Sequence, residues 1–223
     1  MMPHPDTSMP GAGGSPEDLV RACRAHGVRD ERVLDAFRRV RREVFVPPEW
    51  AGQAYRDRPI PIPHGQVTTQ PSLVAQMVAA LHLSGGERVL EVGTGLGFQT
   101  AILAALPSEV YSIERFPRLA AQAERNLEAS EIEGVTVVVG DGTLGLPERA
   151  PFQGIVVSAA APSVPEPLVV QLADGGRLVH PVGSGGDEIV TAYRKVPGGV
   201  FPDGPVTPAH FVRLIGEHGL PEA

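Results

Sequence analysis

Short apolar segments alternate with amphipathic helical segments between residues 73 and 183, and this pattern constrains the fold more than any other feature of the sequence. The apolar runs occupy residues 88–92, 109–114, 135–141, 154–160 and 176–183, and helical periodicity occupies residues 73–81, 98–106, 117–130 and 165–172. Strands that alternate with helices form a parallel sheet with both faces covered. The sequence therefore predicts a doubly wound, Rossmann-like α/β fold.

The part of the chain that precedes this pattern has a different composition. Residues 1–14 are rich in proline, glycine and small polar residues, which predicts a disordered tail. Ser15 followed by Pro16 is typical of a helix start, and a second short helix is predicted around residues 33–40. Residues 42–66 are proline-rich and non-periodic. We therefore expect an N-terminal helical cap followed by a covering segment. Loops of this length more often have a function than serve only as connections.

The C-terminal part predicts an antiparallel edge to the sheet. Residues 188–196 and 210–216 are apolar segments separated by a Gly/Pro-rich loop, and they are predicted to be two antiparallel strands. We expect one domain over residues 15–223. Its predicted parts are a helical cap with a covering loop (15–70), a cofactor-binding core (71–182) and C-terminal strands (183–223).

Composition excludes several classes of function. A formal net charge of -7 is unsuited to non-specific binding of nucleic acid, which needs a basic surface. No apolar run approaches the roughly 20 residues that span a bilayer, and the N-terminus lacks a basic and an apolar region. The single cysteine, Cys23, excludes an intramolecular disulfide, and no Cys/His cluster has zinc spacing. We expect a cytoplasmic protein without metal that binds neither membrane nor nucleic acid.

A glycine-rich turn follows the first strand of the alternating region. Gly93, Gly95 and Gly97 stand between the strand of residues 88–92 and the next helix. Glycine lets the backbone approach a ligand at the N-terminus of a helix, where free N–H groups favour anions and polar groups. A structural strand-to-helix turn would give the same pattern, so the glycines alone indicate a ligand site weakly.

Three acidic residues strengthen the ligand hypothesis. Glu91 precedes the first glycine, Glu114 ends the second strand, and Asp141 ends the third. The carboxyl ends of parallel strands meet at the ligand-binding edge of an open α/β sheet. A pyrophosphate is unsuited to so much negative charge, and the dinucleotide fingerprint lacks the acid before the first glycine. An adenosine ligand that is neutral or cationic, such as S-adenosylmethionine, is favoured.

At this point the chain resembles the class I methyltransferases and, within them, the protein-L-isoaspartate O-methyltransferase family. The similar segments run collinearly from about residue 17 to residue 219. They include AFRRVRREVFVPP, AYRDRPIPIPHGQVTTQP, RVLEVGTGLGFQTAILAAL, VYSIER, GDGTLG, PFQGIVVSAAAPSVPEPLVVQL, GGRLVHPVG and FVRLIGEHG. Thousands of methyltransferases share the glycine motif, whereas the GQ…QP loop combined with PVG is specific to this family.

The resemblance implies a reaction and a set of site residues. The family transfers a methyl group from S-adenosylmethionine to the α-carboxylate of L-isoaspartyl residues, and possibly D-aspartyl residues, in damaged proteins. The expected product of the cofactor is S-adenosylhomocysteine, and we expect a monomer. The implied cofactor-binding residues are Val67, Thr68, Glu91, Gly93, Thr94, Gly95, Gly97, Glu114, Arg115, Asp141 and Gly142. The implied substrate-binding residues are Thr69, Gln70, Val182 and Gly183, with Thr69 as the catalytic positioning residue.

The chain also departs from the family pattern. The family usually reads G-Q-T-I-S-Q-P where this chain reads G-Q-V-T-T-Q-P, so Thr69 replaces an active-site serine and Val67 replaces a threonine. The other departures are Arg41 for proline, Pro63 for glycine, Gln153 for aspartate and Glu188 for glutamine. A carboxylate at position 188 would be unhelpful near an anionic substrate.

The two threonines have two interpretations. Pro71 suits the first position of a helix, so Thr68 and Thr69 lie at its N-terminal mouth, where either hydroxyl could be only a cap. The family resemblance instead makes Thr69 a hydrogen-bond donor to the substrate carboxylate, with Thr68 mainly scaffolding. A carboxylate with a pKa near 3.9 is already ionised at neutral pH and needs no general base. His180 is a weaker candidate, more typical of a surface or capping residue.

Three alternative functions stay open on the sequence alone. A related methyltransferase could act on a different peptide carboxylate, and the changes at Val67, Thr69 and Glu188 keep this alternative open. Alternatively, this protein could bind an adenosine ligand without turnover. An NAD-dependent oxidoreductase is disfavoured by the glycine spacing.

Overall fold

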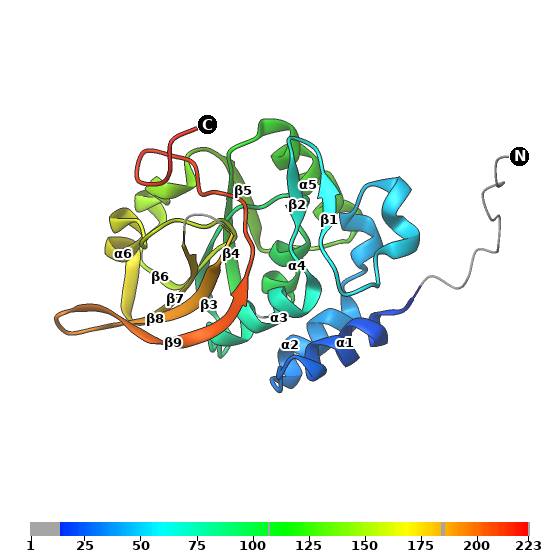
Figure 1. Ribbon diagram of the computed structural model, residues 1–223, viewed down its shortest axis with the longest axis horizontal. Coiled ribbons are helices and arrows are strands. Elements are labelled where there is room, and N and C mark those ends of the chain that lie inside the picture. Colours follow the sequence, from blue (N-terminus) through cyan, green and yellow to red (C-terminus); the bar gives the residue numbers. More distant parts are fainter. Residues whose placement is uncertain (1–13, 107, 184–185, 223) are drawn as a thin grey trace, which may run out of the picture.

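The computed structural model describes residues 14–106, 108–183 and 186–222 (Figure 1). The predicted tail therefore lies outside the described residues except for Gly14. The helices are α1 (Pro16–Ala25), α2 (Glu31–Arg39), α3 (Pro71–Ala80), α4 (Phe98–Ala105), α5 (Pro117–Ala129) and α6 (Glu166–Gln171). The strands are β1 (Ile60–Ile62), β2 (Gln66–Thr68), β3 (Glu87–Val92), β4 (Ser108–Glu114), β5 (Val135–Val139), β6 (Phe152–Val157), β7 (Leu172–Val182), β8 (Glu188–Val196) and β9 (Gly199–Ala209). The short 3₁₀ turns are η1 (Arg42–Phe45), η2 (Pro48–Gln53), η3 (Gly142–Leu144) and η4 (Pro147–Arg149).

The described residues form a seven-stranded sheet with the order β5-β4-β3-β6-β7-β8-β9. Strands β5, β4, β3, β6 and β7 run parallel, whereas β8 and β9 are antiparallel to their neighbours. The order reverses between β3 and β6, and this switch point is where an open α/β sheet binds its ligand. The predicted doubly wound fold with an antiparallel C-terminal edge is confirmed.

The predicted position of the last strand was wrong. The second antiparallel strand is β9, in the Gly/Pro-rich segment, and residues 210–216 lie outside the strands. An edge strand pairs on one side only, so it tolerates prolines whose missing N–H would disrupt a central strand. Residues 210–216 instead run beside the end of β6, where the Ala160 N–H donates to Val212 O at 2.8 Å and the Leu214 N–H donates to Ala160 O at 2.7 Å.

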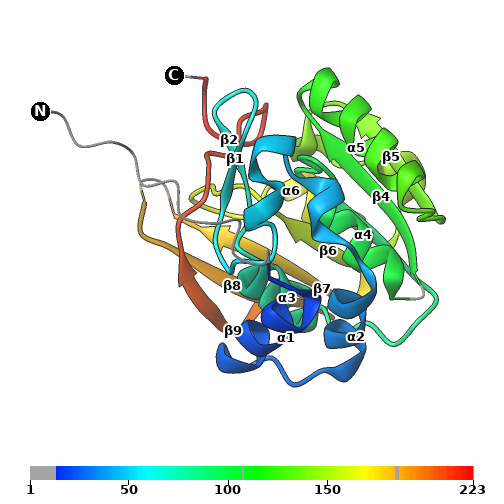
Figure 2. The same cartoon turned by 90° about the vertical axis from the view of Figure 1, so that its right-hand side faces the viewer.

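The N-terminal cap forms from well-capped helices. Ser15 and Asp18 form a capping box at the start of α1, and Asp30 caps α2 by accepting from the Arg32 N–H at 3.0 Å. Figure 2 shows α1 and α2 beside α3, at the end of the molecule opposite the β1–β2 hairpin. The cap therefore packs on the first helix of the alternating region.

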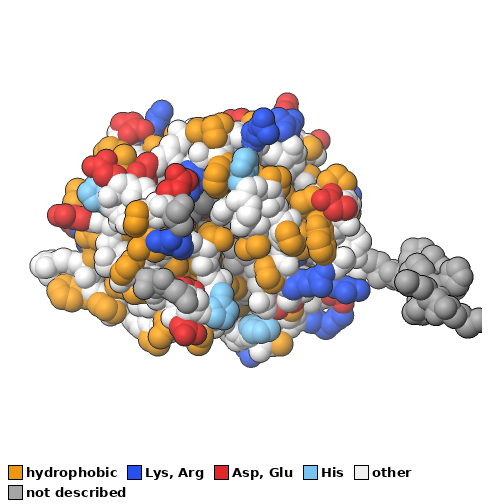
Figure 3. All heavy atoms as spheres, turned by 45° about the horizontal axis from the view of Figure 1, so that its top comes forward, with side chains coloured by type: hydrophobic (Ala, Val, Ile, Leu, Met, Phe, Trp, Pro, Cys, Tyr) orange, Lys and Arg blue, Asp and Glu red, His pale blue; other side chains and the backbone are white. Residues whose placement is uncertain are grey.

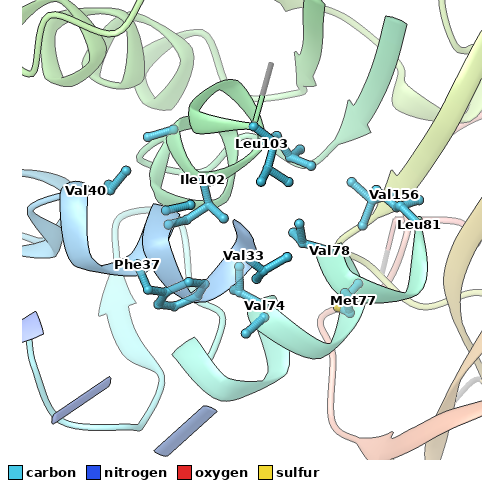
Figure 4. Packing of buried hydrophobic residues seen from close by; sticks show 14 of the residues in the cluster. Val33, Phe37, Val40, Val74, Met77, Val78, Leu81, Ile102, Leu103 and Val156 are labelled. Carbon is cyan, nitrogen blue, oxygen red and sulfur yellow. The ribbon is translucent and has the colours of Figure 1, made fainter. Parts of the chain in front are cut away.

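Alternate residues of the central strands face two hydrophobic clusters, one on each side of the sheet. Val89 of β3 packs in the cluster that includes helices α1 to α4, whereas Leu90 packs in the cluster that includes α6. Figure 4 shows Phe37 of α2, Val78 of α3 and Ile102 of α4 converging in the first cluster. These side chains are at most 1% exposed, and burying each one stabilises the fold by about 1.5–3 kcal/mol. The packing fixes α3 and α4, whose N-terminal ends form the site below.

Within the described ranges, every helix is too short or too polar to cross a bilayer.

Candidate active site

A cavity of about 480 Å³, here called the first cavity, lies at the carboxyl ends of β3, β4 and β6. Its walls include Gly93 after β3, Glu114 at the end of β4 and Ser158 after β6. Ile62, His64 and residues 66–69 of the β1–β2 hairpin and threonine loop, together with residues 212–215 of the C-terminal segment, complete the walls. The cavity therefore occupies the predicted ligand edge of the sheet, and it is enclosed by segments from both ends of the chain.

The glycine turn forms one wall of the first cavity. Gly93 has φ +98° and Gly95 has φ +58°, a region that residues with a Cβ rarely adopt. A Cβ added to Gly93 would also lie 3.3 Å from Ser158 Cβ. Thr94 lies between the two glycines on the cavity wall, and its hydroxyl lies 2.6 Å from the Ser112 hydroxyl. Gly97 is the N-cap residue of α4 with φ +94°, and it is not among the lining residues.

Glu114 carries a carboxylate on the wall of the first cavity, as the sequence predicts. The Gly95 N–H donates to its Oε2 at 2.8 Å, and the Phe116 N–H donates to its Oε1 at 3.0 Å. An ionised carboxylate has about four lone-pair sites, so these two bonds leave acceptor capacity for a ligand's hydroxyl groups. The side chain is held in a fixed position and is only 5% exposed.

Glu91 does not line the first cavity, contrary to the predicted contact with the cofactor. Its carboxylate is fully buried and accepts from the Gln99 amide at 2.9 Å and from the Ser112 hydroxyl at 2.6 Å. Thr100 also donates to it. Burial raises the pKa of Glu91 to about 7, although these hydrogen bonds oppose the rise. Glu91 therefore ties β3 to β4 and α4, and it supports the glycine turn from inside the protein.

Asp141 does not line the first cavity, and its contact with the cofactor stays a prediction. Its carboxylate accepts from the Thr143 N–H at 2.8 Å and from the Glu217 N–H at 2.7 Å, and Asp141 is not among the lining residues. Burial raises the pKa of Asp141, but these bonds outweigh that effect and lower it below its usual value. The neighbouring Gly142 does line the cavity, and a Cβ there would lie 2.3 Å from Val92 Cγ1. Asp141 therefore anchors the C-terminal segment beside the cavity.

A group of aromatic and charged side chains borders the first cavity after β4. The rings of His64 and Phe116 stack with centroids 4.5 Å apart and an interplanar angle of 6°. Arg115 lies 4.8 Å from the Phe116 ring centre and forms an ion pair with Glu222 at 2.6 Å. All four residues line the cavity. The β1–β2 hairpin and the C-terminal segment thus both contact the residues that follow Glu114.

A second cavity of about 420 Å³ adjoins the first. It is lined by Gln70 and Gln76 from α3 and its N-terminal mouth, and by residues 207–212 from the end of β9 onward. The lining residues that the two cavities have in common are Val67, Thr69, Ser158 and Val212. We call these four residues the shared wall. Groups bound in the two cavities would meet at this wall.

The threonines do not cap helix α3. The cap comes from Asp57 of the covering segment, whose carboxylate accepts from the Ser72 N–H at 2.8 Å and from the Ser72 hydroxyl at 2.8 Å. The Gln70 amide donates to the same carboxylate at 2.8 Å. Thr68 is turned inward, where its hydroxyl accepts from Arg42 at 3.0 Å. Within the described ranges the Thr69 hydroxyl has no hydrogen-bond partner, and Thr69 lies on the shared wall.

Val182 and Gly183 do not line either cavity, and their role in substrate binding stays a prediction. The Gly183 N–H donates to Ala161 O at 3.0 Å, so it is engaged within the protein. His180 of the same strand is fully buried, which makes it neither a surface residue nor a cap. Burial lowers the pKa of His180 to about 4.

The departures from the family pattern outside the threonine loop lie away from the shared wall. Glu188 is buried, and its carboxylate accepts from the Gly186 N–H at 2.7 Å and from the Phe211 N–H at 3.2 Å. Gln153 accepts from the Arg88 N–H at 2.8 Å, and Arg41 forms an exposed ion pair with Glu43. Glu188 itself lines neither cavity, although its partner Phe211 lines the second one.

Arg42 is the main residue behind the site that the sequence pattern does not predict. It is 0% exposed and donates to the covering segment and to Thr68. Its signal in the sequence is indirect. A long proline-rich segment has few backbone N–H groups to pair with its own carbonyls. A buried cation close to the apolar face of a helix could donate to those carbonyls instead.

No group of three or more His, Cys, Asp or Glu side chains that could hold a metal ion occurs in the described part of the chain. On the face shown in Figure 3, acidic and basic side chains are mixed, and neither covers a continuous area. The first cavity contains the buried carboxylate of Glu114 beside the glycine turn, whose Gly93 and Gly95 N–H groups donate to Ile113 O and to Glu114.

Comparison with known proteins gives a consistent result. The family described as "Protein-L-isoaspartate(D-aspartate) O-methyltransferase (PCMT)" matches residues 15–219. A protein-L-isoaspartate O-methyltransferase of Aeropyrum pernix is 48% identical over 92% of this chain and 80% of its own length. Protein-L-isoaspartate O-methyltransferase 2 of Marinobacter nauticus is 50% identical over 87% of this chain and 90% of its own length.

Solved structures show the same relationship. A protein-L-isoaspartate O-methyltransferase aligns with a TM-score of 0.79 at 28% identity, covering 92% of this chain and 67% of that one. The fold of a Plasmodium falciparum protein solved with S-adenosyl-L-homocysteine also aligns, with a TM-score of 0.77 at 23% identity, covering 91% of this chain and 99% of that one. The family match, the identities and the arrangement of the glycine turn beside the shared wall agree, and the chain belongs to the protein-L-isoaspartate(D-aspartate) O-methyltransferase family.

Proposed function

We propose that the first cavity holds S-adenosylmethionine, that the second holds an L-isoaspartyl residue of a damaged protein, and that the methyl group passes between them at the shared wall. The main support for this proposal is that the two cavities adjoin at Thr69, whose hydroxyl has no hydrogen-bond partner in the described part of the chain. D-Aspartyl residues, which the family description includes, are a second substrate class.

The walls of the first cavity suit an adenosine ligand with a cationic sulfur. Glu114 has acceptor capacity for the two ribose hydroxyls, and the backbone of Gly93 and Gly95 permits close approach of the amino-acid part. Gly142 leaves room beside Val92 for the base. Glu91 and Asp141 act indirectly, by holding the turn and the C-terminal segment.

Methyl transfer to a carboxylate depends on the placement of the reactants more than on acid or base catalysis. The substrate carboxylate is ionised at neutral pH and attacks the methyl carbon, the carbon–sulfur bond breaks, and neutral S-adenosylhomocysteine leaves. Thr69 donates a hydrogen bond to one carboxylate oxygen and so orients the other toward the methyl group. In-line placement and exclusion of water supply most of the rate enhancement in such a step.

The test combines substrate choice with the Thr69 hydroxyl. Labelled S-adenosylmethionine is offered with paired L-isoaspartyl and L-aspartyl peptides, and we expect methylation of the isoaspartyl peptide only. Thr69→Ser should keep most activity, whereas the near-isosteric Thr69→Val should lower kcat/KM by about 10- to 100-fold, because a hydrogen bond to a charged group is lost.

The outcome that contradicts the role of Thr69 is a Thr69→Val enzyme with parental kcat/KM. Equal methylation of both peptides would favour a broader carboxyl methyltransferase. The affinity for S-adenosylhomocysteine, measured by calorimetry, serves as the control, and it should change little because the hydroxyl is assigned to the substrate.

We also infer a cytoplasmic monomer. One chain supplies the walls of both cavities, and a single cysteine suits a reducing compartment. Light scattering at increasing protein concentration should give the mass of one chain throughout. A concentration-dependent rise in mass that parallels specific activity would contradict the inference.

A further inference from the structure

Arg42 lies at the junction of the helical cap and the covering segment, as the first residue of η1. It exposes none of its surface to solvent. Its guanidinium carbon lies 5.4 Å from the centre of the Phe98 ring, within the range of a cation–π contact. Phe98 begins α4 and lines the first cavity. The buried cation therefore lies directly behind the cofactor side of the site.

The guanidinium holds the covering segment by its backbone. Nη1 donates to Ala54 O at 2.8 Å and to Arg56 O at 3.0 Å, and Nη2 donates to Arg58 O at 3.1 Å. These carbonyls belong to alternate residues of one stretch of chain. A single planar fork of donors thus fixes five residues that have no regular strand or helix pairing.

The same guanidinium also reaches the threonine loop. Nη2 donates to the Thr68 hydroxyl at 3.0 Å and lies 3.5 Å from Thr69 O. The Thr68 hydroxyl is fixed a second time by the Ile60 N–H at 3.2 Å. Arg42 therefore contacts the threonine loop twice, at the Thr68 side chain and at the Thr69 carbonyl, while Thr69 lies on the shared wall.

The charge of Arg42 is held without an ion pair. In the described ranges no carboxylate lies within salt-bridge distance of it, and its partners are neutral oxygens. Burial lowers the pKa of Arg42 to about 10, so the side chain stays a cation at neutral pH. Keeping an unpaired cation in the interior is costly, and a packed apolar side chain would avoid that cost. The arrangement indicates that the donors themselves are needed.

We propose that Arg42 is a positioning residue for methyl transfer: it holds the Thr68 hydroxyl and the Thr69 carbonyl and thereby directs the Thr69 hydroxyl into the shared wall. This inference rests on the proposed function of Thr69. Lysine keeps the charge but lacks the planar fork, so it cannot hold the 54–58 stretch and the threonine loop together.

The test is a double-mutant cycle between Arg42→Lys and Thr69→Val. With isoaspartyl peptide, Arg42→Lys should lower kcat/KM by about 10-fold or more, while S-adenosylhomocysteine affinity changes by less than about 3-fold. In the Thr69→Val background, adding Arg42→Lys should lower kcat/KM by less than about 2-fold, because the hydroxyl that it positions is already gone. Tyr55→Phe, which removes a hydrogen bond to Glu43 in the same segment, is the matched control and should keep parental kcat/KM.

Each result decides between the possibilities. An equal loss in both backgrounds, or a lowered melting temperature with parental kcat/KM, would overturn the role of Arg42. Parental activity of Thr69→Val alone would instead overturn the proposed function of Thr69. If Arg42→Lys does not fold, Thr68→Val takes its place in the cycle, because it removes only one acceptor of the guanidinium. Thr68→Val should lower kcat/KM by about 3- to 10-fold when Thr69 is present and should leave kcat/KM unchanged in the Thr69→Val background.

Discussion

At the scale of single residues, the carboxylates of the site divide into one that faces the first cavity and others that work inside the protein. Glu114 lines the cavity, whereas Glu91 is enclosed by donors from β4 and α4. Asp141 and Glu188 each accept a backbone N–H from the C-terminal segment, at Glu217 and Phe211. Similar positions at strand ends therefore differ in placement, with one carboxylate on the cavity wall and the others bonded inside the protein.

Replacing Glu114 should weaken cofactor binding. Glu114→Ala removes the acceptor assigned to the ribose hydroxyls and frees the Gly95 N–H, so S-adenosylhomocysteine affinity should fall by about 1.5–3 kcal/mol. Calorimetry measures the change. Glu109→Ala, at the other end of β4 in an exposed ion pair with Arg88, is the control and should bind like the parent. Unchanged affinity in Glu114→Ala would exclude this carboxylate from the cofactor site.

The protonation of Glu91 should make stability depend on pH. Burial raises its pKa to about 7 in the folded protein, above the ordinary value of 4.5. Because the folded state holds the proton more tightly, the stabilisation is fully present below pH 4.5 and is lost as the pH rises through 7. Between pH 6 and 8 the parent should lose about 1 kcal/mol of unfolding free energy relative to Glu91→Gln.

Urea unfolding of the cofactor-free protein at several pH values measures this difference. Glu128→Gln, an exposed change on α5, should follow the parent at every pH. A constant difference between the parent and Glu91→Gln across the range would show that Glu91 does not titrate there.

At the scale of elements, the covering segment and helix α3 form one unit joined by Asp57. The carboxylate supplies the N-cap that Gln70 does not provide and also orients the Gln70 amide. Arg42 holds the same segment from the opposite side through the carbonyls of its alternate residues. The segment is therefore fixed at the end of α3 that carries Thr69.

Loss of the Asp57 cap should affect stability and catalysis together. Asp57→Ala should lower the free energy of unfolding by about 1–2 kcal/mol, the usual cost of losing an N-cap. It should also lower kcat/KM for isoaspartyl peptide, because Gln70 and the neighbouring Thr69 lose a fixed support. Asp35→Ala on the exposed side of α2 is the control. Full activity with lowered stability would restrict Asp57 to a structural role.

The elements that the sequence predicts well are those that alternating polarity defines. Strands β3 to β7 and helices α3 to α6 are confirmed because burial on one or two faces sets their pattern. Strand β9 was missed because an edge strand needs neither an apolar pattern nor a complete set of N–H donors. The fold class and the glycine turn could therefore be predicted, while the outer edge of the sheet could not.

The site residues differ in the same way. Glu114, Gly93 and Gly95 line the first cavity because of their positions at a strand end and in a turn, which the spacing of the sequence reveals. The Glu217 N–H that donates to Asp141 lies 76 residues away, and the Ser72 N–H that donates to Asp57 lies 15 residues away. Local sequence patterns do not predict such contacts. Arg42 depends on carbonyls whose positions the covering segment takes only when folded.

At the scale of the whole molecule, turnover should be independent of a titrating enzyme base. His180 is buried with its pKa lowered to about 4 and lies on neither cavity wall, so it stays neutral and distant. The nucleophile is an ionised substrate carboxylate, so kcat should be flat from about pH 6 to 8 when methyl transfer limits turnover. Initial rates at saturating substrate measure the profile, with isoaspartyl peptide free of histidine. A slope of one near pH 7 that disappears in His180→Asn would contradict the carboxylate mechanism.

Residues 212–215 complete the first cavity although they follow the strands β3, β4 and β6 by 55 residues or more along the chain. During synthesis, the glycine turn and Glu114 leave the ribosome long before the segment that encloses them. A nascent chain that stops short of residue 212 lacks this wall, so we expect it to bind S-adenosylhomocysteine more weakly than the full chain does. Prematurely terminated products of this gene should therefore be inert, and they would not consume S-adenosylmethionine in futile hydrolysis.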